Sequence, residues 1–231
     1  MEIIVEAEKL KKKYGRVEAL NNINIKIERA KCYALLGSNG SGKSTLFRII
    51  SNITPKTSGR LTVFGENKID NKIRNKLHYL PDENNLYLWM KLDEVEWFFS
   101  NLYENWNHEL MKELITFLKI PSRKVSTMSR GERVRLKLSI AFSTGVELLL
   151  LDDPLLGIDV KSRAMIIDAI NNFWNPEKQT LFISSHIINE IEGLFDYVFF
   201  INKGEIILEG EADNLRKQYK KSLESIAKED L

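Results

Sequence analysis

A segment rich in glycine and serine near the N-terminus carries the residue types that bind phosphate. It consists of Gly37, Ser38, Asn39, Gly40, Ser41, Gly42, Lys43, Ser44 and Thr45. Its glycines let the backbone curl so that successive N–H groups point at phosphate oxygens, and the positive end of a following helix adds to that field. In such a loop Lys43 reaches the β and γ phosphates of a nucleotide, and Ser44 ligates Mg²⁺. A glycine-rich turn would match the phosphate-loop pattern by chance in roughly one chain of this length in a hundred, so we predict a phosphate-binding loop.

Two adjacent acids form a second candidate site. Asp152 and Asp153 directly follow the apolar run 148–151. If that run is a strand parallel to the one before the phosphate loop, both carboxylates lie beside the loop. Asp152 then suits the shell of Mg²⁺, and Asp153 lies where a general base could orient an attacking water. The alternative, a helix N-cap and a solvated neighbour, is weakened by the presence of the phosphate loop.

The elements that must position these residues are short buried strands. Three apolar runs, at 33–36, 148–151 and 181–183, each end in a polar cluster and precede a helix-like segment. This alternation is typical of an α/β fold with right-handed crossovers and a parallel sheet, whose ligands bind at the carboxyl ends of the strands. Residues 3–7 and 23–28 instead alternate apolar with polar, which predicts half-buried strands.

A helical segment interrupts this α/β pattern. Between residues 86 and 144 the spacing is helical, and Val134, Leu138, Ala141 and Phe142 recur on one face of a helix. After it, Lys203-Gly204 predicts a hairpin turn, and a charged helix is expected from about Asp213. We therefore expect one domain over residues 1–231. Its α/β core with an antiparallel β part takes residues 1–81 and 145–210, a helical subdomain takes 82–144, and the charged helix takes 211–231.

The composition is that of an ordinary folded domain. The 231 residues include 34 Lys and Arg and 32 Asp and Glu, which leaves a formal net charge of +2. This balance argues against a protein that coats nucleic acid. The single Cys32 cannot form an internal disulfide, and because residues 1–6 have neither the basic end nor the long apolar stretch of a secretion signal, we expect none here. Because the apolar runs fall short of the roughly 20 residues of a membrane helix, we expect a cytoplasmic chain that reaches a membrane only through a partner.

Four further motifs follow in an order that resembles ATP-binding-cassette ATPases. They are Tyr14, residues 128–132 (Met-Ser-Arg-Gly-Glu), residues 156–159 (Leu-Gly-Ile-Asp) and His186 after Phe-Ile-Ser-Ser. The resemblance covers about residues 1–210. It implies a RecA-like P-loop NTPase core with an antiparallel β subdomain and an inserted α-helical subdomain. It also implies that ATP and Mg²⁺ are the cofactors.

The resemblance also implies a role for three of these motifs, and residues 156–159 resemble the family's D-loop. Tyr14 corresponds to the aromatic that stacks on adenine, and His186 to the residue that holds the γ-phosphate. Ser129 and the N–H groups around Gly131 correspond to a signature that meets the γ-phosphate bound by a second ATPase subunit, in a homodimer or a heterodimer. The expected partners are that subunit and membrane permease subunits, with no nucleic acid, and the expected location is the inner face of the cell membrane. Taken alone, Ser129 reads as a helix N-cap, His186 as a structural histidine and Tyr14 as a turn aromatic.

The chain departs from the family pattern in ways that bear on its chemistry. Asp153 stands where a glutamate is usual, which retracts the carboxylate by about 1.5 Å. Since a misplacement of about 1 Å can cost on the order of 10²-fold in rate, we predict slow hydrolysis with ATP binding intact. Asp82, with Glu83 as the alternative, stands where a glutamine senses the γ-phosphate and Mg²⁺. A carboxylate can also ligate Mg²⁺, but it repels the phosphate.

The chain departs from the family pattern at two other places. Arg130 replaces a signature glycine, and Leu155-Leu156 replaces a small polar pair. The acid after Leu80-Pro81 and the basic Arg130 in the signature form a pattern. This pattern resembles that of the exporter-type branch, which serves drug, bacteriocin or antimicrobial-peptide permeases. Residues 87–90 are either a docking surface for the permease or part of the core. Two other functions stay open: an ATPase that acts on ribosomes or DNA, and a hydrolysis-impaired regulatory subunit.

Overall fold

A sheet of parallel strands organises the fold. The computed structural model describes residues 2–68 and 70–229, and within them this sheet has six strands in the order β5, β6, β7, β3, β8 and β9. Their bounds are β5 (Leu77–Leu80), β6 (Leu148–Asp152), β7 (Thr180–Ser185), β3 (Cys32–Leu36), β8 (Tyr197–Asn202) and β9 (Glu205–Glu211). Neighbouring strands from β5 to β8 are parallel, and β9 pairs antiparallel with β8. The three buried strands predicted at 33–36, 148–151 and 181–183 are confirmed.

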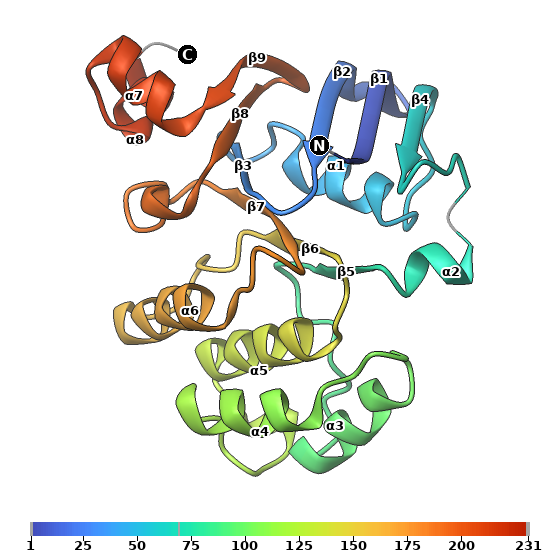
Figure 1. Cartoon of the computed structure of the whole chain (residues 1–231), viewed down its shortest axis with the longest axis vertical. Coiled ribbons are helices and arrows are strands. Elements are labelled where there is room, and N and C mark those ends of the chain that lie inside the picture. Colours follow the sequence, from blue (N-terminus) through green and yellow to red (C-terminus); the bar gives the residue numbers. More distant parts are fainter. Residues whose placement is uncertain (1, 69, 230–231) are drawn as a thin grey trace.

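The two faces of the sheet pack into separate cores because side chains alternate along each strand. Leu149 and Leu151 of β6 join the core that includes α5 (Arg130–Ser143) and α6 (Val160–Phe173). Leu148 and Leu150 join the core that includes α1 (Lys43–Ile50) and the second sheet. Figure 1 shows the same layering, with α5 and α6 below β6 and β7, and α1 above them. The carboxyl ends of β3, β6 and β7 are thereby held in register at one edge.

The second sheet is antiparallel and covers α1. Its strands lie in the order β2 (Val17–Glu28), β1 (Ile3–Tyr14) and β4 (Ser58–Val63). Buried and exposed residues alternate along the second half of β2, as the sequence pattern predicts. Sequence reasoning missed β4, because its first three residues, Ser-Gly-Arg, are exposed and lack strand propensity. It also missed β5, whose four residues include the polar side chains of His78 and Tyr79.

Residues 92–143 are mainly helical. Their helices are α3 (Leu92–Ser100), α4 (His108–Phe117) and α5, with the short 3₁₀ turn η1 (Val125–Thr127) before α5. Ser129 caps α5 through a reciprocal pair of hydrogen bonds: its N–H donates to Glu132 Oε2 at 2.7 Å, and Glu132 N–H donates to Ser129 Oγ at 3.2 Å. This capping box explains why α5 begins at Arg130. Two shorter helical segments are α2 (Asn71–Arg74) and the 3₁₀ turn η2 (Glu192–Leu194).

The C-terminal segment differs from the prediction of one charged helix over 211–231. It forms two helices, α7 (Ala212–Tyr219) and α8 (Leu223–Glu229), and residues 230–231 lie outside the described part. Lys220 breaks the helix with a left-handed φ of 52°. The break lets Leu223 and Ile226 turn back into the main core, where both are fully buried. The prediction was wrong because these two apolar residues stand out little among the charges around them.

Within residues 2–68 and 70–229, none of the helices is both long enough and apolar enough to cross a membrane.

His78 makes the stability of the fold sensitive to acid. It is buried on β5, and its Nδ1 lies 2.7 Å from the Tyr103 hydroxyl. Burial, and secondarily the charge of Lys137, lowers the pKa of His78 to about 4 from 6.5. Because the unfolded chain takes up this proton first, stability present above pH 6.5 is lost as the pH falls towards 4. We expect His78 to lower the free energy of unfolding by about 2 kcal/mol between pH 7 and pH 5.

Urea unfolding at pH 7 and pH 5 tests this expectation. The variant His78→Gln should lose about 2 kcal/mol of the pH dependence. His108→Gln is the matched control for the loss of a histidine, since the His108 side chain is 60% exposed, and the change in His78→Gln should exceed the change in this control. Full pH dependence in His78→Gln would assign the acid sensitivity to other groups.

Candidate nucleotide-binding site

The predicted phosphate loop lies between β3 and α1, as its sequence requires. A Cβ at Gly37 would lie 2.3 Å from the carbonyl oxygen of Ile201, and one at Gly42 would lie 2.8 Å from that of Ala19. Gly42 also has a φ of 114°, which L side chains rarely adopt. The backbone at Ile201 and at Ala19 approaches the loop so closely that glycine is required at both loop positions. Ser41 Oγ is buried without a hydrogen-bond partner in the described part of the chain, a donor that fits a phosphate ligand.

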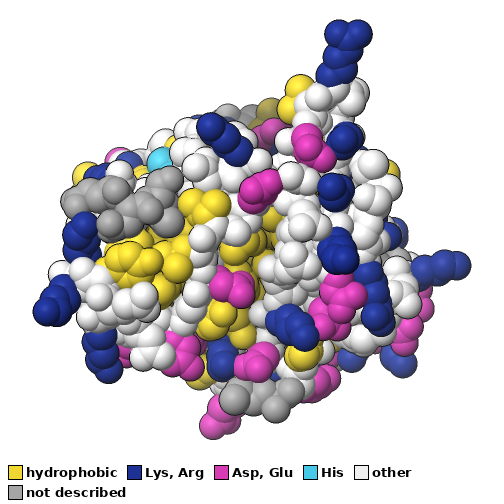
Figure 2. Space-filling view, turned by 90° about the horizontal axis from the view of Figure 1, so that it is seen from above, with side chains coloured by type: hydrophobic (Ala, Val, Ile, Leu, Met, Phe, Trp, Pro, Cys, Tyr) yellow, Lys and Arg dark blue, Asp and Glu magenta, His cyan; other side chains and the backbone are white. Residues whose placement is uncertain are grey.

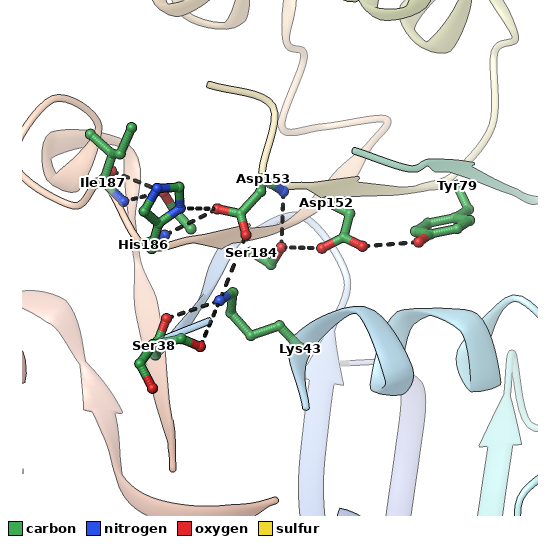
Figure 3. Close-up of polar contacts among 10 residues, drawn as sticks. Ser38, Lys43, Tyr79, Asp152, Asp153, Ser184, His186 and Ile187 are labelled. Atoms are coloured by element: carbon green, nitrogen blue, oxygen red, sulfur yellow. Dashed lines mark hydrogen bonds and ion pairs between the residues drawn. The ribbon is translucent and has the colours of Figure 1, made fainter. Parts of the chain in front are cut away.

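Lys43 occupies the centre of this site. Its ammonium is buried and donates to the carbonyl oxygens of Gly37 and Ser38, at 2.9 and 3.2 Å. It also lies 3.6 Å from Asp153 Oδ2 (Figure 3). The positive charge is thus held where the phosphate loop meets the end of β6.

Asp153 and His186 meet across the ends of β6 and β7. His186 Nδ1 lies 2.7 Å from Asp153 Oδ1, and the His186 backbone N–H donates to the same oxygen at 3.1 Å (Figure 3). Asp153 has a left-handed φ of 43°, and its own N–H donates to Ser184 Oγ at 3.0 Å. Asp153 is largely buried. One carboxylate therefore contacts both the histidine and the lysine that the sequence predicts.

Asp152 is the most enclosed acid of the site. Its Oδ1 accepts from Ser184 Oγ at 2.5 Å, and its Oδ2 accepts from the Tyr79 hydroxyl at 2.9 Å (Figure 3). Burial raises the pKa of Asp152, and the hydroxyls of Ser184, Ser44 and Tyr79 oppose that rise. A carboxylate beside the Ser44 hydroxyl is an oxygen donor set, which hard cations such as Mg²⁺ prefer. The residues present therefore fit the ion that the sequence predicts.

Asp82 and Glu83 lie just beyond the end of β5. Asp82 is half-buried, and its charge acts on both Asp152 and Lys137. Glu83 is exposed and lies 3.4 Å from Arg48 on α1. Of the two candidates, Asp82 has the stronger electrostatic connection to Asp152. Burial lowers the pKa of Lys137 to about 8, although the nearby carboxylates of Asp82 and Asp152 favour its charged form.

The signature residues lie at the start of α5 and are not joined to Lys43 by any hydrogen bond or ion pair among the described residues. A Cβ at Gly131 would lie 2.5 Å from Ser162 Oγ on α6, so glycine is needed for these helices to approach. The Arg130 guanidinium lies against Gly157, where an added Cβ would be 3.0 Å from its carbon. The segments 128–132 and 156–159 therefore lie side by side in this chain.

Tyr14 ends β1 on the hairpin whose partner strand contributes Ala19, the neighbour of Gly42. Its side chain is 46% exposed, and the Lys12 ammonium lies 4.6 Å from its ring centroid. The hairpin that borders the phosphate loop at Gly42 therefore presents a partly exposed ring, a group that can stack on a base.

Sequence reasoning missed three residues that hold the site together. Tyr79 and Ser184 orient Asp152, and Lys137 donates to backbone carbonyls next to Asp82. Tyr79 follows the polar His78 on β5, so nothing in its run marks it. Ser184 directly follows the apolar run 181–183, and a hydroxyl at the end of a buried strand is a usable signal. Lys137 carries a comparable signal, because it interrupts the apolar face of α5.

A phosphate loop after a buried parallel strand, faced by acids from a neighbouring strand, defines a P-loop nucleotide-hydrolysing protein. Within that class, the ABC transporter family matches residues 20–156. The lantibiotic transport ATP-binding protein SrtF of Streptococcus pyogenes is 34% identical, over 91% of this chain and 92% of the relative. The linearmycin resistance ATP-binding protein LnrL of Bacillus subtilis (strain 168) is 31% identical, over 92% and 70%. This chain belongs to the ABC transporter family, as an ATP-binding and ATP-hydrolysing subunit.

The solved structures agree on the fold. The dimeric structure of the ATP-binding cassette MJ0796, in a post-hydrolysis state with ADP and Pi, aligns with a TM-score of 0.77 and 22% identity. The alignment covers 90% of this chain and 98% of that one. The α/β cassette fold with a P-loop core is thereby confirmed.

Proposed function

We propose that this chain powers the export of an antimicrobial peptide or a similar antibiotic through a separate membrane permease. The observation that carries the ATP-hydrolysing part of the proposal is the Lys43, Asp153 and His186 cluster, which places a cation, a carboxylate and an imidazole around the phosphate loop. The relatives that transport a lantibiotic or confer linearmycin resistance support the substrate class. The chain would act on the inner face of the cell membrane, attached through the permease.

The chemistry is in-line attack of water on the γ-phosphate of ATP. Lys43 neutralises charge that develops on the β and γ phosphates. Asp153 accepts a hydrogen bond from the attacking water, and His186 holds the γ-phosphate while it positions the Asp153 carboxylate. Mg²⁺, held by Ser44 and Asp152 with Asp82 as a further acid, would offset the charge of the phosphates. Tyr14 stacks on adenine.

Two copies of the cassette, or this chain and a second ATPase subunit, would enclose each ATP. In one chain, Ser129 and Gly131 are separate from the phosphate loop, so a second subunit is needed to complete the site. The dimeric cassette of similar fold supports this arrangement. Arg130, next to Ser129, adds a cation on the surface that would face the partner's nucleotide.

The docking surface for the permease is an aromatic patch formed by Tyr87, Leu88 and Trp89. These side chains are 53%, 48% and 63% exposed, whereas Met90 is 6% exposed and belongs to the core. Tyr87 packs edge-on against Phe98 of α3, with ring centroids 5.6 Å apart. An exposed cluster of large apolar side chains is typical of a protein interaction site. Of the two readings of residues 87–90, docking surface therefore fits 87–89 and core fits Met90.

Replacement of Trp89 tests this surface. Exposed tryptophans at interfaces often contribute 2 kcal/mol or more, so Trp89→Ser should weaken binding to the permease about 30-fold. ATP turnover and thermal stability of the isolated chain should not change. Ile53→Ser is the control, because Ile53 is 61% exposed but follows α1, in another part of the chain. If both variants weaken binding to the permease equally, or if neither weakens it, the assignment of the patch is contradicted.

Nucleic acid is the less favoured partner. On the face in Figure 2, Lys and Arg side chains are interspersed with Asp and Glu around a hydrophobic centre. A protein that binds nucleic acid gathers its basic residues on one face. The relatives with transport and resistance functions also do not favour action on ribosomes or DNA.

Phosphate release from Mg-ATP tests the proposed function at its root. The purified chain should bind ATP and release phosphate slowly, and its cognate permease in vesicles should raise the rate. Export requires that cells with both proteins survive a peptide antibiotic that kills cells with the permease alone. Failure to bind ATP would end the proposal. Binding without any effect on survival would restrict the function to another cargo.

A further inference from the structure

The loop that carries Asp82 is tied to α5 by a buried lysine. Lys137 lies in the middle of α5 and is only 4% exposed. Its ammonium donates to the carbonyl oxygen of Glu83 at 2.8 Å and also to that of Pro81. A buried ammonium is costly unless its donors are satisfied, and here backbone carbonyls satisfy two of them.

The two accepting carbonyls belong to the residues on either side of Asp82. With both neighbouring carbonyls held at one ammonium, the backbone around Asp82 is restricted and the direction of its carboxylate is constrained. The Asp82 carboxylate also accepts from the Glu83 backbone N–H at 2.8 Å. If Lys137 only neutralised charge, proximity to the acids would be enough. Its hydrogen bonds instead go to the backbone on both sides of Asp82.

The other end of the same loop is tied to the segment just before α5. Val125 N–H donates to Met90 O, and Ser126 N–H donates to Leu88 O, both at 2.9 Å. These bonds connect the aromatic patch to residues three and four positions before Ser129. Both ends of residues 81–91 are therefore hydrogen-bonded, one to α5 and the other to the segment just before it.

We propose that Lys137 is a positioning residue that makes the Asp82 loop move with the signature helix α5 as one unit. The inference rests on the proposed function, in which Asp82 faces the nucleotide's γ-phosphate and metal. Any displacement of Ser129 and Gly131 towards a second subunit then carries Asp82 with it, and the aromatic patch follows. Lys137 thus links closure of the ATP site to the permease surface.

Lys137→Met tests the tie, because methionine keeps most of the volume and removes the donors. In the nucleotide-free chain, hydrogen exchange of the amides in residues 82–90 should become about 10-fold faster, while β3 and β6 stay unchanged. With ATP, the Mg²⁺ concentration for half-maximal turnover should rise about 10-fold, while ATP affinity in EDTA stays the same. Lys137→Arg, with several donors on a long side chain, should restore most of both properties.

Arg133→Met is the matched control. Arg133 lies on the same helix and lines the same 410 Å³ cleft with Asp82 and Lys137, so its loss removes a positive charge without removing the tie. If Arg133→Met reproduces the effects of Lys137→Met, general electrostatics accounts for them and the proposal fails. Unchanged exchange in Lys137→Met, or no rescue by Lys137→Arg, overturns it as well.

Two arms keep the result interpretable. Should Lys137→Met not fold, Lys137→Gln takes its place, since its shorter side chain cannot span both carbonyls. It should give faster exchange in residues 82–90, and unchanged exchange overturns the proposal. Should the wild-type chain release no phosphate, the proposed function fails. The exchange measurement still decides whether Lys137 holds the loop.

Discussion

Lys43→Ala should bind ATP on the order of 10²- to 10³-fold more weakly than the wild-type chain, as expected when one partner of a buried charge pair is removed. The ammonium lies 3.6 Å from Asp153 and 2.9 Å from the carbonyl of Gly37, so it is already held at the phosphate loop. Alanine removes the cation that would meet the β and γ phosphates. It also leaves the buried Asp153 carboxylate without its nearest cationic side chain, which repels the nucleotide.

Equilibrium titration with a fluorescent ATP analogue measures this loss directly. Lys112→Ala is the control, since the Lys112 side chain is 67% exposed on α4, and it should bind as the wild type does. Thermal unfolding of both variants separates lost binding from lost structure. If Lys43→Ala folds and binds ATP within about two-fold of the wild type, the phosphate-loop assignment and the proposed mechanism are wrong.

Asp153→Asn should lower ATP turnover by about 10²-fold or more, the range expected for a general base. The amide keeps the shape of the side chain and can still contact His186, but it has lost the negative charge that orients water. ATP binding should persist, because Asp153 is not a phosphate ligand. The variant should therefore accumulate in the ATP-bound, dimeric state, which size-exclusion chromatography with Mg-ATP would detect.

Asp153→Glu tests whether the short carboxylate limits the rate. An added methylene extends the carboxylate by about 1.5 Å, and we expect up to about 10²-fold faster turnover. Single-turnover phosphate release isolates this step. At the exposed Asp168 on α6, Asp168→Glu is the control for the added methylene, and Asp168→Asn is the control for the charge removed in Asp153→Asn. No gain in Asp153→Glu would show that the length of this side chain is not the limitation.

Local chemistry explains why the candidate site could be predicted as far as it was. The loop around Lys43 needs glycines at particular backbone conformations, and the acids of 152–153 need a buried strand before them. Both requirements are met by residues that are consecutive in the sequence. The parallel pairing of β3, β6 and β7 then places these ends together, and the structure joins Lys43, Asp153 and His186 as the sequence predicts.

Other features depend on distant residues and escaped prediction. The strand β5 exists because Leu77 and Leu80 pair along β6, although the run between them is polar. The break at Lys220 depends on where Leu223 and Ile226 can reach the core. The hydroxyl of Tyr79 and the ammonium of Lys137 show their role only beside Asp152 and the carbonyls around Asp82.

The sequence by itself determined the phosphate loop, the acid pair, the α/β class and the order of the motifs, because each depends on near neighbours along the chain. The tertiary structure alone decided which side chains orient Asp152, how the Asp82 loop is tied to α5 and which part of residues 87–90 faces outward. The physical reason is that hydrogen bonding and burial between segments far apart in the chain are set by packing, which no local pattern records.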